Sequence, residues 1–140
     1  MKLAFAGMIT ALVLIAGLAG LSMSSSEYTV PLAPIDPEDQ STGVGKIRVE
    51  SGPFSNQVQM KVNVMGLEVP EGYVFEGWLV DVETGYKLSL GSFVTQQGAG
   101  TLMFQQNMVN FDLYDTLVIT QEPAWDADPN PFMGVLAGSV

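Results

Sequence analysis

The chain has 140 residues, contains neither cysteine nor histidine, and carries fifteen acidic against five basic residues, for a formal net charge of −10. Without cysteine there is no disulfide, no thiolate nucleophile and no cysteine-bound zinc, and without histidine there is no imidazole-based catalytic triad. The negative charge predicts no binding to nucleic acid, whose phosphates it repels; it fits either solubility in an extracellular setting or cation binding.

Residues 3–23 form an uncharged, mostly apolar stretch of about 21 residues, long enough as a helix to span a bilayer core of about 30 Å. Lys2 before it favours an orientation with the N-terminus on the cytoplasmic side of the membrane and the rest of the chain on the outer side. Two interpretations of residues 1–23 stay open. They are an uncleaved membrane anchor helix, or a signal peptide cleaved near Ser24, where Ser22-Met23-Ser24 has the small-x-small pattern of a cleavage site. Both predict an exported protein, either membrane-anchored and facing outward or secreted.

Residues 24–43 are rich in serine, proline and acidic residues, with prolines at intervals of three. This composition predicts an extended tether between the leader and a folded domain. The alternative is that its apolar residues dock on the edge of a sheet. These residues are Tyr28, Val30, Leu32 and Ile35.

Residues 44–140 predict a β domain. Alternating side chains mark a strand around Ile47 and Val49, and residues 56–65 show the cleanest alternation in the chain. Its apolar members, which predict one dry face, are Val58, Met60, Val62 and Val64.

Residues 73–93 predict a hairpin at the centre of this domain. Val74, Trp78 and Val80 fall on one face of the first strand, and Tyr73, Phe75 and Leu79 fall on the other. A strand that is apolar on both faces is expected in the interior, with Trp78 as the largest core residue. The turn from Asp81 to Tyr86 contains Gly85, which can adopt the positive φ that the reversal needs.

Further strands are predicted at 101–105, 115–121 and about 134–140, with a crossing loop at 107–114 that brings Phe111 and Leu113 toward the core. About seven short strands and no soluble helix predict an all-β fold. We expect an immunoglobulin-like antiparallel β-sandwich, preceded by the N-terminal apolar helix.

Three segments together resemble the outer domain of the membrane anti-sigma-K factors, the RskA family. They are G-W-L-V-D-V-E-T-G-Y-K-L-S-L-G-S-F (77–93), D-T-L-V-I-T-Q-E-P (115–123) and G-V-L-A-G-S (134–139), in the order and spacing of that family. The resemblance covers roughly the last 70 residues. It implies a similar fold outside the membrane and a regulatory or sensing role without catalysis.

Two departures from the family limit what the resemblance implies. Only Met1 and Lys2 precede the apolar stretch, where family members carry a cytoplasmic anti-sigma domain, so we expect no sigma-factor binding. The loop after Glu122-Pro123 is Gly-rich in the family and is A-W-D-A-D-P-N-P (124–131) here.

That loop holds the one candidate metal site. Asp126, Asp128 and Asn130 match the first three ligand positions of a calcium loop, but Pro131 and Ala137 stand where such a loop needs Gly and a bidentate Glu. A turn shaped by Asp, Asn and Pro is the other interpretation, and no other cofactor is expected.

The remaining acids and aromatic residues predict structural roles. We expect the pairs Asp81/Glu83 and Asp112/Asp115 to be solvated loop charges, since nothing in the pattern gathers them in a cleft. Trp125 and Phe132 flank the acidic loop, either as a lid packed on one end of the domain or as ligand-binding aromatics.

The sequence therefore predicts a non-catalytic, membrane-tethered module that binds or senses an extracellular or periplasmic protein or ligand. The alternative is a secreted structural subunit of a surface layer or filament, to which the segment from Tyr28 to Ile35 would add as a strand on a neighbour's sheet.

Overall fold

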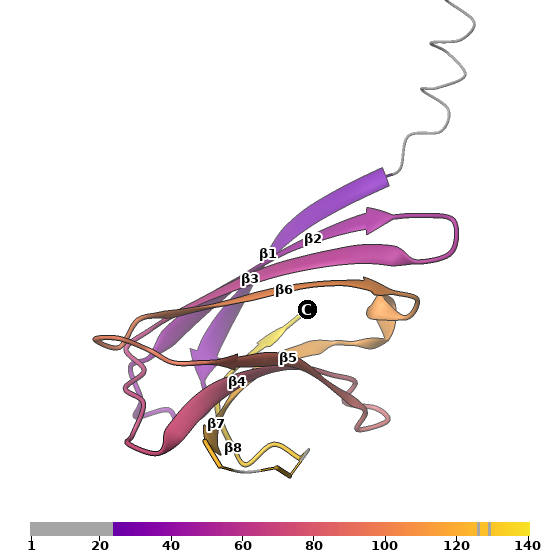
Figure 1. Cartoon of the computed structure of the whole chain (residues 1–140). Coiled ribbons are helices and arrows are strands. Elements are labelled where there is room, and N and C mark those ends of the chain that lie inside the picture. Colours follow the sequence, from indigo (N-terminus) through magenta and orange to yellow (C-terminus); the bar gives the residue numbers. More distant parts are fainter. Residues whose placement is uncertain (1–23, 126, 129) are drawn as a thin grey trace, which may run out of the picture.

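The computed structural model describes residues 24–125, 127–128 and 130–140, which form a single antiparallel sheet of eight strands curled into a nearly closed, barrel-like shape (Figure 1). In chain order the elements are β1 (Ser24–Pro34), β2 (Thr42–Ser51), β3 (Asn56–Met65), β4 (Tyr73–Val80), β5 (Lys87–Phe93), β6 (Gly100–Met108), the 3-10 turn η1 (Phe111–Leu113), β7 (Thr116–Pro123) and β8 (Met133–Ser139). The predicted all-β antiparallel architecture is confirmed.

No helix in the described part of the chain is long and apolar enough to cross a membrane. Residues 1–23, for which the sequence predicts an anchor helix or a signal peptide, lie outside the described residues. Both interpretations of the leader therefore stay predictions.

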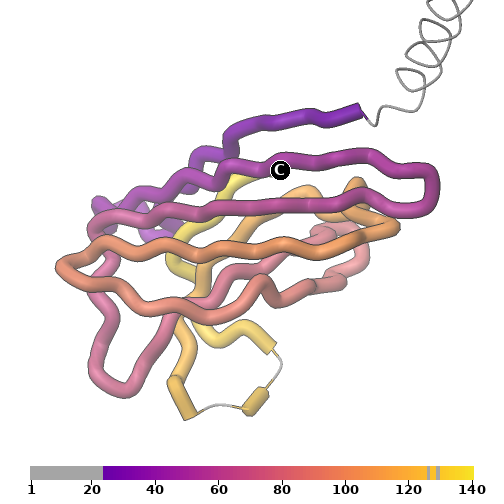
Figure 2. The backbone as a smooth tube through the Cα atoms, turned by 45° about the horizontal axis from the view of Figure 1, so that its top comes forward, coloured from indigo at the N-terminus to yellow at the C-terminus, as the bar shows by residue number. Residues whose placement is uncertain are grey.

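The strand order is β5-β4-β7-β8-β1-β2-β3-β6, and strand β1 connects its two halves. Residues Ser24 to Leu32 of β1 pair with β2, whereas Ala33 and Pro34 pair with β8. Strands that pass from one layer to another in this way turn the corners of curled sheets. Figure 2 shows β1, β2, β3 and β6 side by side. The two separate sheets expected from the sequence are thus joined by hydrogen bonds into one.

Strand β1 also corrects the prediction for residues 24–43. Ser24–Pro34 is a full strand of the sheet with Val30 and Leu32 in the core, and only residues 35–41 form a connection. The alternative of sheet docking was nearer to the structure, although Ile35 is 52% exposed. The part of the sheet that the structure describes therefore starts at Ser24, immediately after the apolar residues 3–23.

The core lies between the two halves of the sheet. Strand β3 has the predicted bounds and alternation, because its four apolar side chains point inward and its polar ones outward. The most fully buried large side chains come from both halves; they are Phe75, Ile47, Leu79, Leu117, Ile119 and Leu136. The apolar periodicity of the strands thus accounts for the core.

Trp78 is buried, as predicted, but it lies outside the main core cluster. Phe75 and Leu79 of β4 point inward, and Trp78, on the other face of the strand, is 5% exposed but outside the main cluster. Leu102 of β6 fills the space beside Gly77 on the inner face. The predicted face assignment in β4 is confirmed, but the face with Trp78 is the outer one.

The connections gather at two opposite ends of the sheet. At the proximal end, Ser24 pairs with Ser51, Ser51 with Asn56, and Asn56 with Met108, which brings the turn at 52–55 beside the connection at 109–115 and the start of β1. The turn at 81–86 lies there too, because Asp115 donates its backbone N–H to Val80. The connections at 35–41, 66–72, 94–99 and 124–132 form the distal end. A ten-residue antiparallel strand, roughly 34 Å long, separates the two ends.

Candidate functional site

The β7–β8 loop at the distal end contains the residues of the predicted calcium site. Oδ1 of Asp128 accepts hydrogen bonds from the backbone N–H of Asn130 at 3.0 Å and from its side-chain amide at 2.9 Å. This is the local turn geometry typical of Asp and Asn. Asp126 lies outside the described residues, so the three-ligand site stays a prediction. Among the residues that the structure does describe, no group of three or more acidic side chains has the spacing of a metal site.

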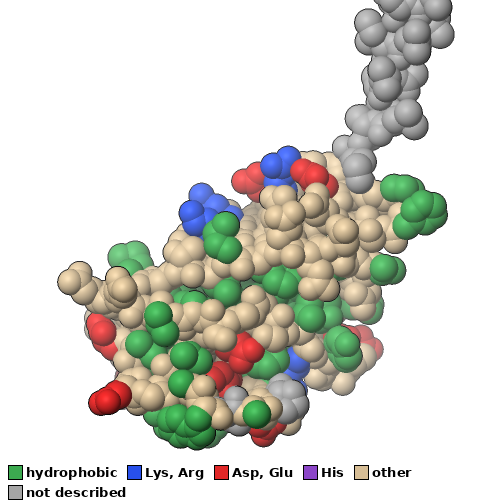
Figure 3. All heavy atoms as spheres, viewed as in Figure 1, with side chains coloured by type: hydrophobic (Ala, Val, Ile, Leu, Met, Phe, Trp, Pro, Cys, Tyr) green, Lys and Arg blue, Asp and Glu red, His purple; other side chains and the backbone are tan. Residues whose placement is uncertain are grey.

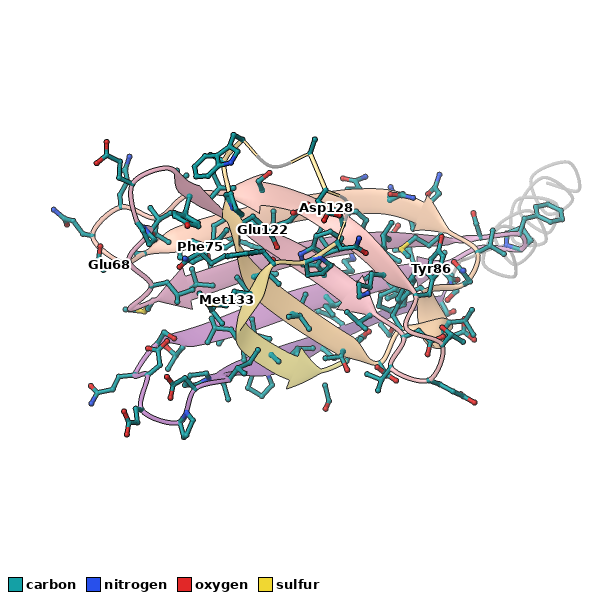
Figure 4. All side chains as sticks on the ribbon, turned by 90° about the horizontal axis from the view of Figure 1, so that it is seen from below. Glu68, Phe75, Tyr86, Glu122, Asp128 and Met133 are labelled. Carbon is teal, nitrogen blue, oxygen red and sulfur yellow. The ribbon has the colours of Figure 1, made fainter. Side chains whose placement is uncertain are left out.

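Glu122 fixes the other side of this loop. It is 5% exposed, and its carboxylate accepts hydrogen bonds from the Phe132 backbone N–H at 2.9 and 3.1 Å and from the Thr120 hydroxyl at 2.5 Å. The Thr120 oxygen in turn accepts the indole N–H of Trp78 at 2.9 Å. Burial of a carboxylate is costly without such donors. This series of hydrogen bonds, from Trp78 through Thr120 and Glu122 to Phe132, therefore positions the loop on the outer face of β4 and β7. Figure 4 shows Glu122 beneath the loop.

Two aromatic side chains of this loop are displayed to solvent. Trp125 is 74% exposed and Phe132 59% exposed, so the predicted lid packed on the core is wrong. Trp125 makes an edge contact with Tyr73, with ring centroids 6.0 Å apart, and lies over Gly72. This contact orients the indole and leaves most of its surface free for another molecule.

An acidic hollow of about 290 Å³ lies beside the loop at the distal end. Asp36, Asp39, Glu68 and Met133 are among the residues that line it, and Phe75 forms part of its base. Asp36 and Asp39 accept hydrogen bonds from the backbone N–H groups of Glu38 and Ser41, which shapes the β1–β2 turn. Figure 4 shows Glu68, Phe75 and Met133 on this side of the molecule.

The connections of the distal end are acidic. Three of its four connections carry acidic residues, and none of the four contains lysine or arginine. The acids are Asp36, Glu38, Asp39, Glu68, Glu71, Asp126 and Asp128. Such a surface attracts cationic groups and repels anionic ones.

A second hollow, of about 480 Å³, lies at the proximal end between the 81–86 turn and η1. Tyr86 and Tyr114 line it, with ring centroids 6.4 Å apart, together with Asp81, Asn110 and Leu113. Leu113 is 56% exposed, so the prediction that it enters the core is wrong, whereas Phe111 is buried as predicted. The sequence does not signal this hollow, because its residues come from connections far apart in the chain.

Two ionisable groups of the second hollow, Asp81 and Tyr114, have shifted pKa values. The Thr84 hydroxyl donates to Asp81 at 2.6 Å and, with the backbone N–H groups of Glu83 and Thr84, lowers the pKa of this carboxyl. Burial raises the pKa of Tyr114, and the nearby Tyr86 and Asp81 raise it further. Asp81 is only 9% exposed, so the expectation of a solvated charge is corrected. Its lone pairs are used to hold the 81–86 turn.

The other three acids of the predicted pairs, Glu83, Asp112 and Asp115, are exposed, as expected. Asp115 accepts the Val82 backbone N–H at 3.3 and 3.4 Å and the Thr116 hydroxyl at 2.8 Å, which ties the 81–86 turn to the start of β7. Asp81 and Asp115 therefore both hold the 81–86 turn through hydrogen bonds.

Comparison with protein-family models finds no match, and comparisons with curated proteins and with solved structures find none either. The resemblance to the RskA outer domain therefore stays a prediction.

Proposed function

We propose that the protein is a non-catalytic extracytoplasmic module, tethered to a membrane through residues 3–23, that binds or senses a cationic partner with its distal end. The observation that carries this proposal is the exposed acidic and aromatic surface around Trp125, Phe132, Asp36 and Glu68. It stands on loops held by a rigid sheet, at the end opposite to Ser24, where binding residues commonly lie. A tethered domain would present this end away from the bilayer.

The chemistry of this surface indicates the class of partner. Exposed tryptophan and phenylalanine beside carboxylates attract lysine and arginine side chains through cation–π contacts and through charge. Tryptophan is also enriched among the residues that dominate binding energies. We therefore propose a basic protein segment or a cationic ligand as the partner, outside the membrane.

The RskA-like fold and its two-layer description belong to the same proposal. The three resembling segments fall in β4–β5, β7 and β8, which are consecutive neighbours in the order β5-β4-β7-β8. They thus form one half of the molecule, and we propose that the halves pack on each other as the layers of an immunoglobulin-like sandwich. The common core between them supports this description.

The alternative, a secreted structural subunit, is less well supported. It relied on the segment from Tyr28 to Ile35 adding to a neighbour's sheet. Residues Tyr28 to Pro34 already pair with β2 and β8 of their own chain. A subunit of this kind would have to use the edge of β1 that faces away from β2, where β8 pairs only with Ala33 and Pro34.

The proposal is tested with the full chain in nonionic detergent and synthetic peptides that combine lysine or arginine with aromatic residues. We expect these peptides to bind more tightly than counterparts with glutamate in place of the basic residues, and less tightly as salt is added. Trp125→Ala should weaken binding roughly tenfold, the loss of a typical aromatic anchor.

The matched control is Met103→Ala, because Met103 is 69% exposed on the outer face of β6, away from the distal end. Equal affinities of the two variants, measured by biolayer interferometry, would refute the role of the distal end. Equal binding of basic and acidic peptides would refute a cationic partner.

A further inference from the structure

The proximal end carries exposed apolar side chains at the tips of its connections. Phe54 is 90% exposed, Val109 78%, Val82 65% and Leu113 56%. Phe54 stands on the connection Gly52-Pro53-Phe54-Ser55, which has no charged residue. Apolar residues this exposed at several neighbouring tips indicate an interaction surface. Figure 3 shows hydrophobic side chains over the β2–β3 turn.

These tips lie beside the point where the described chain begins. Ser24, the first residue of β1, pairs with Ser51, so their Cα atoms are about 5 Å apart. Phe54 follows three residues later and can lie at most roughly 10 Å further on. Phe54 is therefore within roughly 15 Å of the residue that follows the apolar stretch.

No spacer separates that stretch from the sheet. Residues 3–23 are uncharged, and β1 is paired from Ser24 onward. The headgroup layer on each side of a bilayer core is roughly 5–8 Å thick. If residues 3–23 span the core, Phe54 is within reach of this layer.

We propose that the proximal end docks on the outer surface of the bilayer that holds residues 3–23, with Phe54 inserted among the lipid headgroups. This inference rests on the tethering in the proposed function. Aromatic side chains favour this zone, where an apolar ring meets a polar environment. Glu83 and Asp112 on the neighbouring connections disfavour an anionic surface, so apolar insertion into zwitterionic lipid is the mode of contact.

The absence of cysteine from the sequence makes the test direct, since one engineered cysteine labels one site. The full chain is reconstituted into phosphatidylcholine vesicles with an environment-sensitive fluorophore at Phe54→Cys, or at Trp125→Cys as the distal control; both native side chains are largely exposed. We expect a blue-shifted emission at position 54, quenched by lipids that carry a nitroxide near the headgroup. The fluorophore at position 125 should keep the emission that it shows in water, and the nitroxide lipids should not quench it.

A second variant separates insertion from mere proximity. With the fluorophore at Val109→Cys, adding Phe54→Glu should reduce the lipid quenching at position 109, because a charge at the tip opposes insertion. The quenching should change little between low and high salt, since the contact is apolar.

Each other outcome contradicts the inference in a distinguishable way. Water-like emission at position 54 in protein that floats with the vesicles overturns docking and leaves tethering intact. A blue shift without nitroxide quenching assigns the surface to a second copy of the chain. Failure to float with vesicles overturns tethering in the proposed function and docking with it.

Discussion

At the scale of single residues, the buried carboxylate of Glu122 shows how one acid can organise a loop. It accepts hydrogen bonds from the Phe132 backbone and the Thr120 hydroxyl, and Trp78 completes the network through Thr120. The side chains of Glu122, Thr120 and Trp78 are all buried. The display of Trp125 and Phe132 at the distal end therefore depends on polar contacts beneath the loop.

Glu122→Gln should destabilise the protein by about 1–3 kcal/mol, because an amide N–H₂ then faces groups that donate hydrogen bonds. Urea unfolding followed by circular dichroism measures the change. Glu71→Gln, at an exposed position of the same end, should stay within about 0.5 kcal/mol of the wild type. Equal unfolding midpoints for the two variants would show that the network contributes nothing.

At the scale of elements, β1 decides how the two halves of the sheet join. The position of β1 depends on a close approach to β8. A Cβ atom on Gly138 would overlap the backbone carbonyl oxygen of Pro31 and press on Leu32. Only glycine permits this spacing. The small residue in β8 thus allows β1 to lie between β8 and β2.

Gly138→Ala should cost about 1–3 kcal/mol of stability, since a backbone atom cannot move aside as a side chain can. Hydrogen exchange should accelerate first at Val30 and Leu32, because β1 is the strand displaced. Gly134→Ala is the matched control, since a Cβ there meets only the flexible end of the half-exposed Ile35. Faster hydrogen exchange throughout the sheet, with β1 exchanging no faster than β3, would contradict the claim that Gly138 positions β1.

The sequence predicted the elements whose pattern is local. Alternation gave β3 its bounds, and Gly85, with φ of 75°, confirmed the turn of the central hairpin. Strand β1 was missed because its prolines and serines outweighed the alternation of Tyr28, Val30 and Leu32. Pro31 is tolerated because β8 pairs only with Ala33 and Pro34, so β1 has no partner on that side at Pro31.

The second hollow, at the proximal end, was less predictable for a physical reason. Tyr114 meets Asp81 and Tyr86 of the 81–86 turn only because β4 and β7 pair side by side, and no spacing in the sequence encodes that meeting. The sequence also could not show whether the face of β4 that carries Trp78 is the inner or the outer one. Both faces of β4 are apolar, so the alternation alone could not say which one is inside.

At the scale of the whole molecule, charge is unevenly distributed. The distal connections carry no basic residue, whereas Lys46, Arg48 and Lys61 lie on the outer face of β2 and β3. The one ion pair between described residues joins Arg48 to Glu50 at 2.8 Å. Most of the negative charge is thus balanced by counterions in the solvent.

Salt should therefore stabilise the folded protein. Raising the ionic strength from 0.01 M to 0.15 M shortens the screening length from about 30 Å to about 8 Å and weakens the mutual repulsion of the acids. We expect the urea midpoint of the full chain in nonionic detergent to rise over this range. The rise should be smaller in the double variant Glu38→Gln/Glu71→Gln, and an unchanged midpoint in the wild type would rule out self-repulsion as a significant term.

The position of β1 also has a mechanical consequence. A pull on Ser24 along the strand axis acts in shear on the hydrogen bonds between β1 and β2, which run perpendicular to the strands and therefore share the load. Nine residue pairs from Ser24 to Leu32 resist together, instead of opening one after another as in a zipper. Attachment through β1 thus makes the N-terminal end a strong point for bearing tension, and the distal loops keep their arrangement while the chain is under load.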